Sequence, residues 1–266
     1  ILHLSWIMLL QMSTCLAYSR LARVQCTFGP HCTYPAPELD YRMVFSETDT
    51  AVSLGRLHEI AAMFDKWCTI PDYSVPAYES TRFDKPFGAI PQGRVYFLPQ
   101  QQIRIHPSMS ELMGKILRRD QQGYVFLASY GLGTPDLYEI IFRENADVAD
   151  RIIVSKGAVG VPQYRARLSS ADALLDGRII GCGMNAYEAL LQGRPMITWP
   201  NELFTGRILF GLYKIADSKL LLDNLVSRNA DEYAETAVTR ANDKELPKEL
   251  SVELVRFLPR IFGPEG

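Results

Sequence analysis

The stretch from Asp172 to Pro200 constrains the fold of this chain more than any other. Its pattern predicts a strand over residues 173–175, a loop with Gly177, Gly181 and Gly183, a helix over residues 185–192, and a strand over residues 195–199. Such a βαβ unit places the loop at the carboxyl end of a parallel sheet. The unpaired N–H groups of the helix amino terminus can then bind a phosphate.

The glycine spacing leaves a second interpretation open. It matches neither GxGxxG nor GxxxxGK[ST], and helix-opening glycine loops are common. The glycines are equally compatible with a turn that serves only tight packing.

Composition and charge exclude several classes of function. The 266 residues allow one large domain or two medium ones. The formal net charge is -2 and the Lys and Arg residues are scattered, so no nucleic acid partner is expected. The five cysteines form no CxxC pair, which argues against a disulfide framework or structural zinc and favours a reducing compartment. His31 beside Cys32 has no further ligands at a suitable spacing, so no metal is expected.

The first third of the chain is irregular. Residues 1–16 are apolar, but polar residues interrupt them and no basic region precedes them, so we expect a buried strand and a helix ending near Arg20, with no membrane segment. The chain begins inside this apolar run, which indicates a fragment. Further strands are expected over residues 23–28 and 41–45. Residues 67–92 are rich in Pro, Tyr, Asp and Gly and are expected to link two lobes.

After this linker, strands and helices alternate regularly. Strands are predicted over residues 94–98, 124–128, 151–155, 173–175 and 195–199, with a further apolar run at 219–222. Helices are predicted over residues 108–118, 135–143, 163–169, 185–192, 203–215, 230–241 and 251–261. This alternation predicts a doubly wound parallel sheet of about six strands. Ligands of such sheets bind outside the carboxyl ends of the strands, where the strand order switches.

The loop over residues 99–107 follows the first strand of this sheet and carries Gln101 and Arg104. An arginine here can hold a diphosphate through two charge-assisted hydrogen bonds, and Gln101 can donate to a phosphate or sugar oxygen. The alternative for both residues is plain solvation at the surface.

Two further residues fall on the same predicted edge. Tyr164 opens the helix before Asp172, and its ring is large enough to stack on a nucleobase, although aromatic residues more often fill a core. Glu188 lies on the first turns of the helix after the glycine loop, where its carboxylate can accept hydrogen bonds from ribose hydroxyls. Its alternative role is a favourable partner of the helix dipole.

Three long stretches carry a family resemblance. The stretches SADALLD…GCGMNAYEALLQGRPMITWPNELFTGR, YFLPQQQIRIHPSMSELMGKIL and LAYSRLARVQCTFGPHCTYPAPELDY resemble the catalytic region of O-linked N-acetylglucosamine transferases, glycosyltransferase family 41. The resemblance runs from about residue 3 to residue 243. It implies an α/β fold of the GT-B type with two Rossmann-like lobes: an incomplete acceptor-side lobe over residues 1–85, a nucleotide-sugar-binding lobe over 86–245, and a closing helix over 246–266.

The resemblance also implies roles for individual residues. Arg104 stands where the family has a lysine that contacts the UDP phosphates, and Gln101 stands where the family has a glutamine close to that lysine. Tyr164 falls where the family often has a histidine stacking on uracil, and Glu188 where it has an acidic residue binding ribose. Substrate contacts are also implied for the residues around the diphosphate: Cys182, Gly183, Met184 and Asn185. Arg207 matches a further family position without a defined role.

The implied activity is transfer of N-acetylglucosamine from UDP-N-acetylglucosamine to Ser or Thr hydroxyls of proteins, with inversion and without a metal or other cofactor. Arg104 would be the catalytic cation. The implied partners are the UDP-sugar and an acceptor protein or peptide, and the implied location is cytoplasmic or nucleocytoplasmic. The alternatives are a scaffold that binds UDP-sugar without transferring it, and a GT-B UDP-N-acetylglucosamine 2-epimerase.

The sequence departs from the family pattern in the glycine loop. Two threonines of the family become Met184 and Asn185, which removes two hydroxyl donors, although the Asn185 amide can donate instead. Cys182 lies inside this loop, beside the helix amino terminus. A thiol in that position is expected to have a lowered pKa, to react readily, and to be protected by bound UDP.

Overall fold

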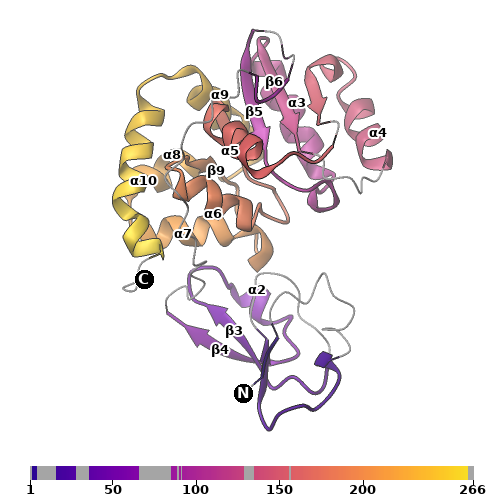
Figure 1. The fold of residues 1–266 in the computed structure, drawn as a ribbon, viewed down its shortest axis with the longest axis vertical. Coiled ribbons are helices and arrows are strands. Elements are labelled where there is room, and N and C mark those ends of the chain that lie inside the picture. Colours follow the sequence, from indigo (N-terminus) through magenta and orange to yellow (C-terminus); the bar gives the residue numbers. More distant parts are fainter. Residues whose placement is uncertain are drawn as a thin grey trace.

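The computed structural model describes residues 2–4, 16–27, 36–65, 85–88, 90, 92–128, 135–155 and 157–262. The described residues form two lobes, each built on a parallel sheet (Figure 1). The linker predicted over residues 67–92 lies largely outside them, so the lobe boundary near residue 85 stays a prediction. Residues 5–15, expected to continue into a helix, also lie outside the described residues.

The amino-terminal lobe has four strands in the order β1-β2-β3-β4 among the described residues: β1 (Leu2–Leu4), β2 (Gln25–Thr27), β3 (Tyr41–Phe45) and β4 (Ile60–Phe64). The strand predicted over residues 41–45 is confirmed, and the one over 23–28 is confirmed in a shorter form. A short helix, α2 (Ala51–Leu54), joins β3 to β4. It begins where the Thr50 side chain accepts a hydrogen bond from the Ser53 N–H, which satisfies a free donor of the first turn.

Among its described residues, the carboxyl-terminal lobe has five parallel strands in the order β7-β6-β5-β8-β9: β5 (Arg94–Leu98), β6 (Gly123–Leu127), β7 (Ile152–Val154), β8 (Ala173–Leu175) and β9 (Met196–Ile197). The helices of this lobe are α3 (Ser108–Arg119), α4 (Pro135–Glu144), α5 (Val161–Ser170), α6 (Met184–Leu191), α7 (Ile208–Ala216), α8 (Lys219–Leu225), α9 (Ala230–Asn242) and α10 (Leu246–Phe262). The strands lie between helices, which explains their continuous apolar runs, such as Val95–Leu98 in the buried strand β5.

The described part of the sheet has five strands where about six were predicted, because residues 219–222 are helical. Three successive leucines suggest a strand, but the preceding residues set up a helix. Asp217 ends α7 in the left-handed conformation (φ 55), and the Ser218 hydroxyl accepts from the Leu221 N–H at 3.4 Å. Only a single bridge, between Thr198 and Val226, extends the sheet beyond β9 among the described residues.

Between β5 and β8 the chain changes the side of the sheet on which it adds strands, and all strands stay parallel. From β5 the chain first adds β6 and β7 on one side, then crosses back to add β8 and β9 on the other. The connections after β5 and β8 therefore lead to opposite sides of the sheet from neighbouring positions at its carboxyl edge. This is the position where doubly wound sheets bind ligands. The long helix α10 runs along the flank of this lobe beside α6, α7 and α8 (Figure 1).

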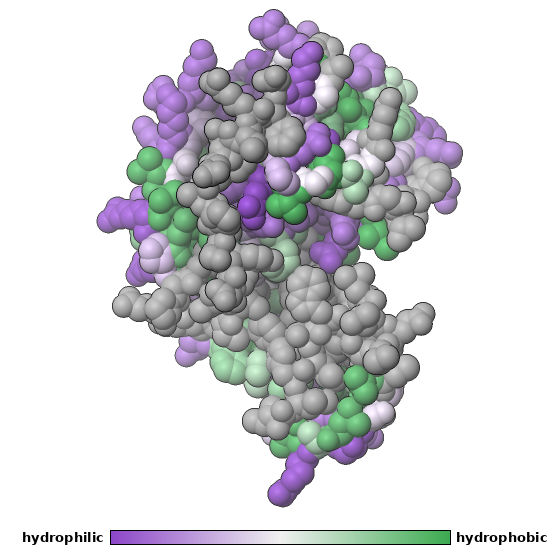
Figure 2. All heavy atoms as spheres, in the orientation of Figure 1, coloured by the Kyte–Doolittle hydropathy of each residue, from purple (hydrophilic) through white to green (hydrophobic). Residues whose placement is uncertain are grey.

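The two lobes touch through the segment after β9. Thr50 donates its hydroxyl to the Glu202 carbonyl at 2.6 Å, and Arg207 Nε donates to the Thr48 carbonyl at 3.1 Å. Lys214 and Glu47 form an ion pair at 2.7 Å, so Glu47 joins the lobes. Outside this contact, the described surface of the carboxyl-terminal lobe is largely hydrophilic in the view of Figure 2. Within the described ranges, no helix combines the length and apolar character needed to cross a bilayer.

Candidate functional site

The loop after β5 brings an unpaired cation to the switch point. Residues Gln102–Arg104 form a single 3-10 turn, in which the Arg104 N–H donates to the Gln101 carbonyl at 2.9 Å. The Gln101 side chain is exposed, and Arg104 is half-buried. The Arg104 guanidinium makes no hydrogen bond or ion pair with any described residue, so all its donors remain available to a ligand.

The loop after β8 is organised by a buried carboxylate, Asp176. One carboxylate oxygen accepts from the Cys182 N–H at 2.7 Å and the Gly177 N–H at 3.0 Å, while the other accepts from the Thr198 hydroxyl at 2.9 Å. Burial raises the pKa of this carboxyl group. Sequence reasoning assigned Asp176 no role, although an aspartate directly between a buried strand and a glycine loop is a usable signal.

Gln100 ties the two loops together. Its side-chain amide donates to the Ile180 carbonyl at 2.6 Å and to the Gly181 carbonyl at 3.2 Å. Gly177 is required here, because a Cβ on it would collide with the Ile180 carbonyl and approach the Gln100 amide. The loops after β5 and β8 are therefore joined by hydrogen bonds at the switch point.

Gly183 caps the amino terminus of helix α6, next to Arg104. Gly183 has φ 55 and ψ -122, a conformation that side-chain-bearing residues rarely adopt. Arg104 Nη1 lies 3.5 Å from the position that a Cβ on Gly183 would take. Within the described part of the chain, the backbone N–H groups of Gly183 and Met184 have no acceptor, as expected for the first turn of a helix. A guanidinium and two free N–H groups thus converge, an arrangement suited to an anion.

The Asn185 side chain does not face this anion position. Its amide donates to the Pro99 carbonyl, which fastens the start of α6 to the end of β5. In this arrangement Asn185 supplies positioning rather than the amide donor expected for a diphosphate, and Met184 is half-buried without a polar donor on its side chain.

The expectation of a reactive Cys182 is wrong. The residue is 2% exposed, and its thiol contacts the Leu175 carbonyl at 3.6 Å. Burial and the nearby Asp176 carboxylate raise the pKa of the thiol, whereas the positive charge of Arg104 lowers it by a smaller amount. The backbone of Cys182 is also bonded within the protein, since its N–H donates to Asp176 and its carbonyl accepts from the Asn185 N–H. We therefore expect slow alkylation with or without a ligand.

Tyr164 lies in the core beneath the start of α5. Its side chain is 6% exposed, and its ring meets that of Phe97 edge-on at a centroid distance of 6.4 Å. Neither ring face is open in this arrangement, which favours the core alternative over base stacking. The exposed apolar residue at this helix start is Val161.

Glu188 is half-buried on the second turn of α6. Burial raises the pKa of this carboxyl group, and the positive charge of Arg165 on α5 partly opposes that shift. The carboxylate makes no hydrogen bond to the described residues, so its oxygens are free to accept from a ligand. Its position is compatible with the ribose contact that the sequence predicts.

Arg207 belongs to the lobe contact. Besides its bond to Thr48, it donates through Nη1 to the Asn201 carbonyl at 3.1 Å and stacks over the Phe210 ring at 4.8 Å. Burial lowers the pKa of its guanidinium, against the charges of Glu202 and Asp49. These hydrogen bonds and the ring contact place Arg207 in the packing between the lobes.

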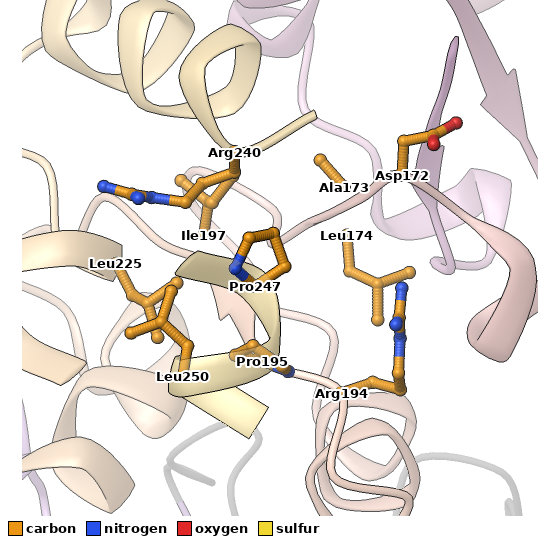
Figure 3. A pocket seen from close by; sticks show the side chains of 10 residues that line it. All are labelled: Asp172, Ala173, Leu174, Arg194, Pro195, Ile197, Leu225, Arg240, Pro247 and Leu250. Atoms are coloured by element: carbon orange, nitrogen blue, oxygen red, sulfur yellow. The ribbon is translucent and has the colours of Figure 1, made fainter. Parts of the chain in front are cut away.

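A separate cavity lies at the opposite, amino-terminal edge of β8 and β9 (Figure 3). Its walls include Leu174, Ile197, Leu225, Leu250, Arg194 and Arg240. The two guanidinium groups extend to opposite sides (Figure 3), where Arg194 donates to the Ala171 carbonyl and Arg240 to Asn224. The polar groups do not converge, so the cavity is part of the packing. Within the described ranges, no group of three or more His, Cys, Asp or Glu side chains is placed to hold a metal ion.

No family model matches the chain. Among solved structures, a mutant of Thermobaculum terrenum O-GlcNAc transferase is similar with a TM-score of 0.70 and 20% identity, over 91% of this chain and 45% of that one. A mutant of S. aureus TarM, in complex with fondaparinux, alpha-GlcNAc-glycerol and UDP, is similar with a TM-score of 0.57 and 12% identity, over 91% and 48%.

The fold is of the GT-B type. The predicted α/β architecture with two Rossmann-like lobes is thereby confirmed. This chain spans less than half the length of either solved chain. At these identities the similarity concerns the fold, and the roles of the site residues remain predictions.

Proposed function

We propose that the carboxyl edge of the sheet, where the loops after β5 and β8 meet, binds the diphosphate of a UDP-sugar. The observation that supports this most directly is the convergence of Arg104 with the free N–H groups of Gly183 and Met184. Together these groups offer positive charge and directed donors at one place, and no described carboxylate pairs with Arg104. Glu188, one turn into α6, would accept hydrogen bonds from the ribose.

We infer further that the chain belongs to a glycosyltransferase that moves N-acetylglucosamine to Ser or Thr hydroxyls of proteins. Negative charge grows on the UDP leaving group as the glycosidic bond breaks, and Arg104 and the helix amino terminus would stabilise that charge. Attack in line with the leaving group inverts the anomeric centre. The acceptor would therefore approach from the amino-terminal lobe. The proposal needs no divalent cation, so transfer is expected to continue in excess EDTA.

The test is to incubate the protein with radiolabelled UDP-sugars and a library of peptides that contain Ser and Thr. Label from UDP-N-acetylglucosamine should appear on peptide hydroxyls, and the Arg104→Met variant should transfer far less. Label from UDP-glucose alone would reject N-acetylglucosamine as the donor sugar. Absence of both transfer and UDP-sugar hydrolysis would reject the enzyme.

A second candidate is a protein that binds UDP-sugar without transferring it. The glycine loop favours it, because Met184 carries no hydroxyl donor and the Asn185 amide is bonded to the Pro99 carbonyl. This candidate predicts UDP binding by calorimetry with neither transfer nor hydrolysis in the same incubation.

A further inference from the structure

A second guanidinium lies at the same edge of the sheet, stacked on a tryptophan. Arg178 follows β8 and Trp199 follows β9, so both lie beyond the carboxyl ends of neighbouring strands. The Arg178 Cζ lies 3.8 Å from the centre of the Trp199 ring. This is close for a cation–π contact, and it holds the planar group in one orientation.

The Arg178 guanidinium has no anionic partner in the described protein. Its Nη1 is buried without a hydrogen-bond acceptor, and burial alone lowers the pKa of the group, with no neighbouring carboxylate opposing it. The surrounding backbone is fixed, since Asn201 donates its side-chain amide to the Arg178 carbonyl at 2.8 Å. The Nε and Nη2 donors also bond to no described residue but, unlike Nη1, are not buried, so an anion at the surface can accept hydrogen bonds from both.

The position of this pair separates it from the diphosphate site. Arg104 approaches Gly183 from the β5 side, whereas Trp199 lies on the β9 side. The segment that continues from Trp199 is the one that touches the amino-terminal lobe, through the Glu202 carbonyl and Arg207. Arg178 and Trp199 therefore lie toward the lobe from which an acceptor would approach.

We propose that Arg178, held against Trp199, binds a carboxylate of the acceptor peptide, so that the protein selects acceptors with an acidic residue beside the reacting hydroxyl. This rests on the proposed function, because it assigns the acceptor side of the same site. The guanidinium fork and the flat indole together fit a planar carboxylate, which can accept two parallel hydrogen bonds.

The test uses binding, so that it does not depend on transfer. Two fluorescent peptides, identical except for Glu or Gln next to a serine, are titrated into the UDP-loaded protein and into the free protein, and UDP binding is measured separately by calorimetry. The wild type should bind the Glu peptide about tenfold more tightly, the low end for a charged hydrogen bond. Arg178→Gln should remove this preference and leave the UDP affinity unchanged.

Arg256→Gln is the matched control, since Arg256 stacks on Phe257 on α10, away from the sheet edge. It should keep the preference, and Arg178→Lys should keep part of it, which provides a second variant if Arg178→Gln does not fold. No preference in the wild type, or a preference that persists in Arg178→Gln, overturns the proposal. A loss of UDP affinity in Arg178→Gln would mean that Arg178 binds a phosphate of the UDP-sugar and not the peptide carboxylate, which also overturns the proposal. Failure of the wild type to bind UDP rejects the proposed function, while the peptide preference is still read on the free protein.

Discussion

At the scale of single residues, the decisive feature is a cation that the protein leaves unpaired. Arg94, Arg118 and Arg119 each bond to an aspartate in the same lobe, and Arg151 bonds to backbone carbonyls. Arg104 has no such partner among the described residues, although it is half-buried beside the start of α6. An arginine kept without a partner at the ligand edge of a sheet indicates a binding role more strongly than its charge alone.

Arg104→Ala should weaken UDP binding by about 1.5 to 3 kcal/mol, because one charge-assisted hydrogen-bond partner of the diphosphate is lost. Uridine binding should hardly change, since uridine carries no phosphate. Calorimetry with both ligands measures the two effects. Arg118→Ala is the control, because its guanidinium pairs with Asp147 at 2.7 Å away from the site. Equal losses for UDP and uridine would contradict the assignment.

Glu188 predicts a pH dependence of nucleoside binding. In the proposed function its ionised carboxylate would accept hydrogen bonds from ribose hydroxyls, and burial raises its pKa. As the pH falls through this raised pKa, the carboxylate is protonated, so uridine affinity should fall at a higher pH than an ordinary glutamate would cause. Uridine is the right probe because it lacks the phosphates of UDP, which titrate themselves. Titrations of the wild type and of Glu188→Gln measure the effect, and the variant should bind more weakly without this pH dependence. An identical pH profile in both proteins would remove Glu188 from the site.

At the scale of elements, most strands can be predicted from the sequence, and the orientation of side chains cannot. Strands β3, β5 and β8 match their predicted ranges because each is an apolar run bounded by polar or turn residues. Strand β4 was not predicted, since the two alanines in its sequence IAAMF have a low strand propensity. The position of Arg104 could be predicted, because a loop that follows a parallel strand lies at the carboxyl edge of the sheet. The burial of Tyr164 could not be predicted, because its ring packs on Phe97, which is distant in the sequence. The burial of Cys182 could not be predicted either, because it depends on how the loop folds around Asp176.

The start of α6 gives a test at this scale. Gly183→Ala should lower the free energy of unfolding by about 1 to 2 kcal/mol relative to Gly160→Ala, because Gly183 has a positive φ and Gly160 has φ -65. Both glycines cap a helix without a side-chain hydrogen bond, so losses common to that position cancel. Urea denaturation measures the difference. Gly183→Ala should also weaken UDP binding, whereas Gly160→Ala should not. Equal stabilities of the two variants would show that the loop relaxes freely.

At the scale of the whole molecule, the described contact between the two lobes is closely packed at helix α7. Helix α7 passes so close to the amino-terminal lobe that a Cβ on Gly211 would collide with the Thr48 methyl group. The ion pair between Lys214 and Glu47 lies beside this point, and its partial exposure limits its contribution to about 1 kcal/mol or less. Close packing at Gly211 therefore matters more to the lobe arrangement than the charge pair.

Gly211→Leu should separate the lobes while leaving the nucleotide site intact. Leucine favours a helix over glycine by up to about 1 kcal/mol, so α7 itself should not be weakened and any change arises at the lobe contact. Small-angle X-ray scattering should show a larger radius of gyration, and UDP affinity should stay within about twofold, because Arg104 and Gly183 belong to the carboxyl-terminal lobe. Acceptor binding, which in the proposed function involves both lobes, should fall. Gly160→Leu, at an exposed glycine, is the control and should change none of these quantities. An unchanged radius of gyration in Gly211→Leu, with acceptor binding retained, would mean that the lobes are held by other contacts and that the approach of α7 to Thr48 is incidental.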